Sequence, residues 1–386
     1  MNPRLSLLTT PASLEIADRV RALQADGCEV VALQTGDPDF AVPAEIVTAC
    51  HKAMADGWTH YGNTRGLPAL REALAENARA ELNVDFDPGS EVLITNGGSH
   101  AVFCGLQALL SPGDEVVLLD PSWPQYAAGV LLAGGVPVRV ACRAANDFQP
   151  DVEDLRKAVT KRTRLLILNS PCNPSGAVLN RPRLEQIAKL AVENDLLVLS
   201  DEVYRTILHT DDEYVSIASL PAMRNRTIRI DSFSKRFAMP GLRLGVIMAS
   251  AEWIDAVVPI SQCSITNVNP SVQLAGREAL TNPAVMAASR EMSQRYTERF
   301  HEIVDYMDSL QLKYHKPQGA FYFLVNIEPF GKTSTDFALE LLERKQTAVV
   351  PGVSYGDSCD HWIRITFAAS IDEVKRGLLS IAHFDK

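Results

Sequence analysis

The sequence predicts an α/β protein that combines a large, mostly parallel-sheet domain with a smaller α+β domain. Between residues 92 and 248, short runs rich in Val, Ile and Leu alternate with amphipathic helical stretches. Near-continuous apolar strands are typical of a parallel sheet that helices cover on both faces. From about Asn282 onward a long helical run precedes shorter strands and helices, which indicates a second structural unit.

The elements follow from these patterns in chain order. The expected strands of the large sheet are Val92–Thr95, Glu115–Leu119, Val136–Val140, Arg164–Leu168, Leu196–Ser200, Thr227–Ile230 and Gly245–Met248. Helices are expected between several of them, at Ala101–Leu110, Val152–Thr160 and Arg183–Glu193. The smaller unit is predicted to contain a helix over Pro283–Leu310, a strand at Ala320–Val325, a helix near Thr335–Arg344, strands at Ala348–Val350 and Trp362–Thr366, and a final helix.

Three segments are expected along the chain of 386 residues. Residues 1–45 form an N-terminal segment, residues 46–281 the large domain, and residues 282–386 the small domain. The stretches Ser13–Gly27 and Pro43–Asp56 have helical patterns and lie outside the sheet order. We expect this N-terminal region to pack against the small domain.

Composition and charge exclude several functions. The net charge is −10 with no lysine- or arginine-rich run, so neither nucleic acid nor an anionic membrane is an expected partner. The seven cysteines are scattered and never form a CxxC pair, which indicates reduced thiols in a cytoplasmic protein and no metal site. The apolar run within Met1–Thr10 is too short for a signal peptide, and no apolar run approaches membrane length.

Polar clusters follow the predicted strands. They are Asn96-Gly97-Gly98-Ser99-His100, Asp120-Pro121-Ser122-Trp123, the run from Asn169 to Gly176, Asp201-Glu202-Val203-Tyr204, and Asp231-Ser232 with Lys235. In open α/β sheets, ligands bind beyond the carboxyl ends of the strands. The sequence therefore predicts one ligand site at this edge of the sheet.

The segment Ser232–Gly245 is the most informative one. Lys235 lies among Ser, Gly and apolar residues, and Arg243 follows eight positions later. Burial disfavours the charged form of a lysine, so its amine becomes nucleophilic and can form a Schiff base. Ser232 and Arg243 can hold a phosphate beside it. A surface Lys-Arg pair is the alternative interpretation.

Gly97-Gly98-Ser99-His100 ends a strand and opens a helix, which makes an anion site from free N–H groups and the helix dipole. A simple N-cap with a tight turn would have the same pattern. No GxGxxG motif occurs in the chain, which argues against a dinucleotide-binding dehydrogenase.

Asp201 follows an apolar strand and, being partly buried, needs a partner such as a pyridinium nitrogen. Tyr204 and Asn173 could hydrogen-bond a phenolic oxygen. Alternatively, Asp201 caps a helix and Asn173 belongs to a turn.

Two further residues suit a flat, anionic ligand. Trp123 ends a strand and could stack on a ring, although it could equally fill the core. Arg364 lies inside an apolar strand, where a buried guanidinium needs an anion such as a carboxylate. An internal Asp or Glu would also satisfy it.

Together these residues resemble the class I/II aminotransferases of fold type I, the pyridoxal-phosphate (PLP) enzymes typified by aspartate and aromatic aminotransferases. The resemblance spans nearly the whole chain. It also includes Leu33-Gln34-Thr35-Gly36-Asp37-Pro38-Asp39-Phe40, His60-Tyr61-Gly62, Gly66-Leu67-Pro68-Ala69-Leu70-Arg71 and Ile363-Arg364-Ile365-Thr366. It implies a PLP-dependent aminotransferase that moves the amino group of an L-amino acid to a 2-oxo acid by a ping-pong mechanism through pyridoxamine phosphate.

The resemblance also implies a role for each site residue. Lys235 forms the Schiff base and moves the proton, Asp201 holds the pyridine nitrogen, Asn173 and Tyr204 bind the ring oxygen, and Trp123 stacks on the ring. Ser99, the His100 backbone, Ser232 and Arg243 hold the phosphate. Tyr61 reaches the phosphate of the other subunit, which implies a homodimer with shared sites. Arg364 binds the substrate carboxylate with Asn173 and the Gly36 backbone.

Two departures from the family pattern affect the pocket. Phe237-Ala238-Met239-Pro240-Gly241-Leu242-Arg243 differs from the usual run before the arginine, and Cys172 replaces a common Asn or His. A second cation for a dicarboxylate substrate is not evident, although Arg65 is conceivable. A lyase, a cyclase or another specialist of the same fold would share the cofactor residues, so these outcomes stay open, as does a ligand-sensing regulator.

Overall fold

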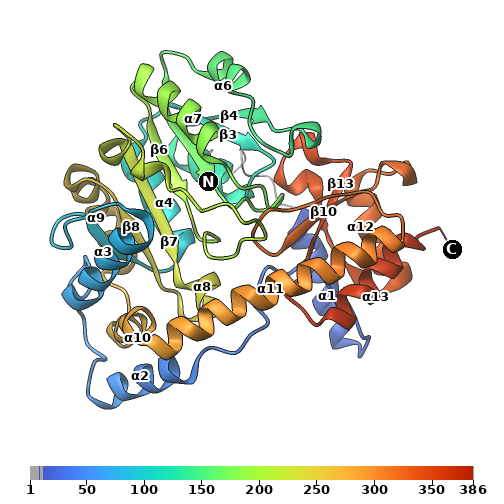
Figure 1. Cartoon of the computed structure of the whole chain (residues 1–386), viewed down its shortest axis with the longest axis horizontal. Coiled ribbons are helices and arrows are strands. Elements are labelled where there is room, and N and C mark those ends of the chain that lie inside the picture. The colour runs from blue at the N-terminus through green and yellow to red at the C-terminus, as the bar shows by residue number, and fades with distance from the viewer. Residues whose placement is uncertain (1–7, 9–11, 386) are drawn as a thin grey trace.

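The computed structural model describes residue 8 and residues 12–385 and confirms the predicted fold class. A seven-stranded sheet with the order β2-β8-β7-β6-β5-β3-β4 forms the centre of the larger part of the molecule (Figure 1). Only β8 runs antiparallel to its neighbours in this sheet. The stretch Met1–Thr10, where a signal peptide was not expected, lies outside the described residues except for Leu8.

The strands of the large sheet lie close to the predicted ranges. They are β2 (Val92–Thr95), β3 (Glu115–Asp120), β4 (Val136–Ala141), β5 (Thr163–Asn169), β6 (Leu197–Asp201), β7 (Thr227–Ser232) and β8 (Gly245–Met248). Several strands extend by one or two residues into the polar cluster that follows. Polar residues such as Asp201 and Ser232 therefore end strands and do not begin loops.

Burial on both faces explains the continuous apolar runs. In β5, Leu165 and Ile167 belong to the core on one face, whereas Leu166 and Leu168 belong to the core on the other. Successive side chains of a strand point to opposite faces. Each face therefore needs its own apolar residues, and the strands lose the alternating pattern of a half-exposed sheet.

Helices connect and cover these strands. They are α3 (Pro68–Leu82), α4 (Gly98–Leu109), α5 (Pro124–Ala133), α6 (Val152–Ala158), α7 (Arg181–Glu193), α8 (Phe233–Arg236), α9 (Ala251–Ile265) and α10 (Pro270–Thr281). The helix predicted from Ala101 begins earlier, at Gly98, because Gly97 turns the chain directly out of β2 with φ +80°.

The C-terminal part is built around an aromatic core. Its elements are α11 (Pro283–Ser309), β9 (Tyr314–His315), β10 (Tyr322–Asn326), α12 (Ser334–Lys345), β11 (Thr347–Ala348), β12 (Val350–Pro351), β13 (Trp362–Thr366) and α13 (Ile371–Ala382). A four-stranded sheet has the order β12-β13-β10-β9. The single strand predicted at Ala348–Val350 is wrong, since it is split at Val349 and its halves pair with different strands.

The N-terminal region divides between the two parts of the molecule. Helix α1 (Ala12–Ala25) packs on α12, and β1 (Val31–Ala32) pairs with β11. Helix α2 (Ala44–Ala55) instead packs on α10, at the far end from α1 (Figure 1). The expected packing on the small domain was therefore wrong for α2. The domain boundaries after residues 45 and 281 stay a prediction.

No helix within residue 8 and residues 12–385 is both long and apolar enough to cross a membrane.

Candidate active site

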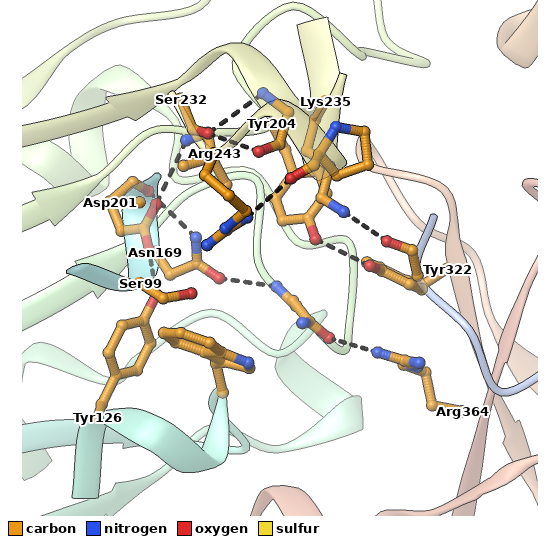
Figure 2. A pocket seen from close by; sticks show the side chains of 17 residues that line it. Ser99, Tyr126, Asn169, Asp201, Tyr204, Ser232, Lys235, Arg243, Tyr322 and Arg364 are labelled. Carbon is orange, nitrogen blue, oxygen red and sulfur yellow. Dashed lines mark hydrogen bonds between the residues drawn. The ribbon is translucent and has the colours of Figure 1, made fainter. Parts of the chain in front are cut away.

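A cavity of about 270 Å³ opens at the edge of the large sheet where the parallel strands end. The ends of β6 and β7 and the turn after β2 reach it from the large sheet, while β10 and β13 reach it from the smaller sheet. Figure 2 shows Tyr126 and Asp201 on one side of the cavity and Tyr322 and Arg364 on the other. The lining residues are Gly36, Gly98, Ser99, Trp123, Tyr126, Asn169, Asn173, Asp201, Val203, Tyr204, Ser232, Ser234, Lys235, Pro240, Arg243, Tyr322 and Arg364.

Lys235 lies in the short helix α8, directly after β7. Its Nζ donates a hydrogen bond to the carbonyl oxygen of Gly36 and lies 5.6 Å from the centre of the Phe321 ring. Burial lowers the pKa of Lys235 to about 8, and the nearby Arg364 and Arg243 act in the same direction, while Asp37 opposes it. About a tenth of the amine is therefore neutral and nucleophilic at pH 7, far more than for an ordinary lysine.

Asp201 is the last residue of β6, and only 5% of its surface is exposed. Tyr126 Oη donates to Asp201 Oδ2 at 2.6 Å, and the Val203 N–H donates to Oδ1 at 3.3 Å. Burial raises the pKa of Asp201 to about 6, although both hydrogen bonds oppose this shift. Within the described part of the chain, no cation lies at ion-pair distance from this carboxylate. A buried acid that faces a cavity in this way suits a cationic ligand atom.

An anion-binding corner forms where α4 and α8 begin. Ser99 lies in the first turn of α4, and Ser232 caps α8 by accepting a hydrogen bond from the Ser234 N–H. A side chain at Gly97 would lie 2.6 Å from Arg243 Nη2, so only glycine lets the guanidinium lie against this turn. Helix N-termini and an arginine favour a bound phosphate.

Arg364 lies in β13 on the opposite side of the cavity and is 5% exposed. Its Nη1 donates to Asn173 Oδ1 at 3.1 Å, and its Nη2 donates to the Gln34 carbonyl. The Arg364 Nε is buried without a partner among the described residues. No carboxylate of this part of the chain pairs with Arg364, so the alternative interpretation, an internal ion pair, is wrong for the described residues.

Two tyrosines join the two parts of the molecule at the cavity. Tyr204 follows β6, Tyr322 begins β10, and their hydroxyls share a hydrogen bond of 2.8 Å. A side chain at Gly36 would lie 2.1 Å from Tyr322 Oη, so glycine lets the backbone approach here. Trp123 also lines the cavity and meets the Tyr126 ring edge-on at 5.2 Å.

Three residues named from the sequence lie elsewhere. The His100 ring shares a hydrogen bond of 2.7 Å with Ser264 Oγ, and its side chain is outside the cavity lining. Tyr61 is 88% exposed and does not reach the cavity of its own chain. Arg65 pairs with Asp255, so its guanidinium is engaged away from the cavity.

The sequence did not identify four polar residues of the lining: Tyr126, Asn169, Ser234 and Tyr322. Asn169 has a visible signal, because it directly follows the predicted strand Arg164–Leu168 and opens the polar cluster that contains Asn173. Tyr126 and Tyr322 lie in apolar stretches and look like core aromatics. Only the pairing of β10 with β13 brings Tyr322 beside Arg364, where the guanidinium lies 4.3 Å from the ring centre.

These residues fit pyridoxal phosphate. The neutral amine of Lys235 suits its aldehyde, the unpaired carboxylate of Asp201 suits its pyridine nitrogen, and the corner of Ser99, Ser232 and Arg243 suits its phosphate. The large sheet places all of them at one edge. Fold and site thus define a fold type I enzyme that uses pyridoxal phosphate.

Comparison with known proteins specifies the class further. The family model for aminotransferase class I and II matches residues 29–381. The aspartate aminotransferase of Pyrococcus abyssi is 37% identical over 378 residues, 98% of this chain and 96% of that relative. Aromatic-amino-acid aminotransferase 2 of Thermococcus litoralis is 34% identical over 379 residues, with the same coverage of 98% and 96%.

A solved structure agrees with the sequence relatives. Thermus thermophilus aspartate aminotransferase with maleate superposes with a TM-score of 0.94 at 36% identity, covering 99% of this chain and 98% of that one. The chain belongs to the class I and II aminotransferase family. It is a PLP-dependent aminotransferase that moves an amino group from an L-amino acid to a 2-oxo acid in a ping-pong reaction.

Proposed function

We propose that Lys235 is the catalytic base of this transamination, that Asp201 holds the cofactor's pyridine nitrogen, and that Arg364 binds the substrate's α-carboxylate. The observation that carries the proposal is the lining of one buried cavity by all three residues. When bound, pyridoxal phosphate links to the substrate nitrogen and draws electrons away from the substrate's Cα. The chain's own residues then have to orient the substrate and move its proton.

The other proposed roles concern the same cavity. Asn173 and Tyr204 would bind the phenolic oxygen and Trp123 would stack on the ring. Ser99, the backbone of His100, Ser232 and Arg243 would hold the phosphate. The Gly36 backbone and Asn173 would assist Arg364. The His100 side chain turns to Ser264, which supports the backbone role that the resemblance implies.

Lys235 suits proton transfer because its environment keeps the amine poised between its two protonation states. Its pKa of about 8 lies near neutral pH, where general acid–base catalysis is most effective. The neutral amine accepts the proton from the substrate's Cα, and the ammonium form returns a proton later. Arg364 fixes the carboxylate by a two-point hydrogen bond and so limits which substrate bond faces Lys235.

We also infer a cytoplasmic homodimer whose two sites each contain Tyr61 from the partner. Tyr61 is 88% exposed, and Val47, Met54 and Trp58 nearby in the chain are 55%, 53% and 44% exposed. Such a group of exposed apolar side chains suits a subunit contact. All seven cysteines are free thiols, which supports a reducing compartment.

A half-reaction tests the proposed roles. The enzyme loaded with pyridoxal phosphate is mixed with each common amino acid in the absence of a 2-oxo acid, and the visible absorbance band is followed. We expect the band to bleach while one equivalent of 2-oxo acid appears per site. Lys235→Ala should lack the band and turnover, whereas the exposed-lysine control Lys157→Ala should retain both.

Other outcomes would contradict the proposal. Continuous release of 2-oxo acid or ammonia with the band retained would indicate a lyase or a related specialist of the same fold. Full turnover by Lys235→Ala would remove Lys235 from its proposed role.

A further inference from the structure

Four cavity-lining residues have a charged neighbour in the sequence that lies outside the cavity lining. Glu202 follows Asp201, Arg205 follows Tyr204, Asp231 precedes Ser232, and Arg236 follows Lys235. The proposed function uses none of these charged neighbours. They meet behind the cavity, together with Arg229 from β7 and Glu81 from α3.

The six charged side chains form one continuous chain of ion pairs. Arg229 Nε donates to Glu202 Oε2 at 2.7 Å, and Arg229 Nη2 donates to Asp231 Oδ2 at 2.6 Å. Arg205 then bridges Asp231 Oδ2 at 2.9 Å and Glu81 Oε2 at 2.6 Å. Arg236 Nη2 donates to Glu81 Oε1 at 2.6 Å. This network of ion pairs thus extends from the residue beside Asp201 to the residue beside Lys235.

Burial and charge balance set this network apart from the surface ion pairs. Glu202, Arg205, Arg229 and Arg236 are buried, and three carboxylates face three guanidinium groups. Burial raises the pKa of Glu81, but Arg205 and Arg236 outweigh it and lower this pKa to about 2. Removing one member leaves an opposite charge buried and unbalanced.

Asn77 adds a neutral member on the same helix as Glu81. Its Oδ1 accepts hydrogen bonds from Arg205 Nη2 and Arg236 Nη1, both at 3.1 Å. Asn77 lies one turn before Glu81 on α3, so both residues touch the same pair of arginines. A negative charge beside these two arginines can therefore be removed by Glu81→Gln or added by Asn77→Asp, and both substitutions nearly preserve the shape of the side chain.

We propose that this network positions the catalytic residues, because it holds the residue that is adjacent to each of them in the sequence. Glu81 and Asn77 anchor the network to helix α3. The proposal rests on the catalytic roles proposed above for Lys235 and Asp201. Glu81 and Asn77 are positioning residues, because they act through Arg205 and Arg236 and do not line the cavity. A network that served stability alone would protect the fold and leave the titration of Lys235 unchanged.

Glu81→Gln and Asn77→Asp test the proposal by opposite changes of charge. The charged groups that face Lys235 directly are Asp37, Arg243 and Arg364, and Asp201 lines the same cavity. Both variants retain all four of these groups. The main measurement is the pH midpoint of the visible absorbance band after loading with pyridoxal phosphate. kcat, KM and the Tm of the cofactor-free chain are measured in parallel. Glu76→Gln on α3 is the matched control, because Glu76 pairs with the exposed Arg79 and with no other of the described residues.

We expect shifts of opposite sign. Glu81→Gln leaves excess positive charge beside Lys235 and should lower the midpoint by about half a pH unit, whereas Asn77→Asp should raise it by a similar amount. Glu81→Gln should also lower kcat about tenfold with little change in KM, since misplacement affects the chemical step. Glu76→Gln should match the wild type in every measurement.

Two results would overturn the proposal. In the first, Glu81→Gln has a lower Tm, but its pH midpoint and its kcat equal those of Glu76→Gln. In the second, the pH midpoint shifts in the same direction in Glu81→Gln and Asn77→Asp. If Glu81→Gln does not fold, Asn77→Asp still decides by the sign of its shift. Failure of the underlying function is distinguishable, because Lys235→Ala would then keep the visible band.

Discussion

At the scale of single residues, the site depends on how strongly burial changes ordinary side chains. Lys235 and Asp201 lie in the same cavity, yet burial moves their pKa values towards each other, to about 8 and about 6. Burial makes the charged form of each group less favourable than it is in water. Their chemistry is therefore a property of the fold around them and not of the residue type alone.

The lowered pKa of Lys235 predicts how the stability of the cofactor-free chain depends on pH. Its pKa is about 8 in the folded chain and 10.5 in the reference state, so the unfolded chain binds more protons between these values. Stability should therefore rise with pH through this window. The free energy of unfolding should gain about 2–3 kcal/mol from Lys235 between pH 7.5 and pH 10.5.

Denaturant unfolding of the cofactor-free wild type and Lys235→Met checks this prediction. The difference between the two chains isolates Lys235 from other titrating groups. A difference that does not change with pH would show that Lys235 titrates normally.

Arg364 predicts a substrate-binding defect. Replacing Arg364 by Ala removes the two-point hydrogen bond to the α-carboxylate and should lower kcat/KM about 10- to 100-fold, mainly through KM. Lysine at this position should restore only part of the loss, because it lacks the planar fork. Steady-state kinetics with a series of amino acids measures this. Arg139→Ala in β4, away from the cavity lining, is the control, and an unchanged KM in Arg364→Ala would place the carboxylate elsewhere.

At the scale of elements, the antiparallel strand β8 supports the anion-binding corner, which we propose holds the cofactor's phosphate. A side chain at Gly245, the first residue of β8, would lie 2.6 Å from the Gly97 backbone and 2.8 Å from the Gly98 N–H nitrogen. These atoms are backbone and cannot move without displacing the start of α4. The strand therefore needs glycine where it passes the turn.

Gly245→Ala should accordingly weaken cofactor binding in a folded protein. We expect the Kd for pyridoxal phosphate to rise at least about tenfold, since displacing the turn misaligns its N–H donors. Gly241→Ala is the control, because a side chain there would meet no atom within 4 Å. Titration of the cofactor-free chains by absorbance measures both. Equal Kd values would mean that the turn tolerates the displacement.

At the scale of the whole molecule, the site combines residues from distant parts of one chain and, by our proposal, from two chains. The long helix α11 extends from beside α10 to the elements of the smaller sheet (Figure 1). Gln34, Asn173 and Arg364 meet although they come from different thirds of the sequence. By our proposal that Arg364 binds the substrate carboxylate, this binding requires that all three segments are assembled.

The proposed sharing of Tyr61 predicts complementation between two impaired chains. Tyr61→Phe should weaken cofactor binding and Lys235→Ala should abolish turnover, but a mixed dimer contains one site with neither change. The two variants are mixed under conditions that allow subunit exchange. Each mixed dimer should then have up to about half of the activity of a wild-type dimer. Sedimentation establishes the dimer first. A monomer, or no recovery in a verified mixed dimer, would contradict shared sites.

The sequence by itself determined the fold class and most of the site. Strands buried on both faces require continuous apolar runs, and parallel strands bring their carboxyl ends to one edge. Those two rules sufficed to place Ser99, Asp201, Ser232 and Lys235 together. The apolar strand around Arg364 indicated an anion beside it, and the resemblance to aminotransferases specified that anion as the substrate carboxylate. Such features are local patterns or follow from strand direction.

Only the tertiary structure decided the contacts between segments that the sequence keeps apart. The place of Tyr126 in the site depends on its hydrogen bond to Asp201 at the end of β6, and that of Tyr322 on the pairing between β10 and β13. The split of residues 347–351 into two strands depends on two different partners. The ion-pair network behind the cavity likewise exists only because α3 brings Glu81 to Arg205 and Arg236. Local patterns specify which face is apolar, whereas the identity of the partner across that face follows from packing of the whole chain.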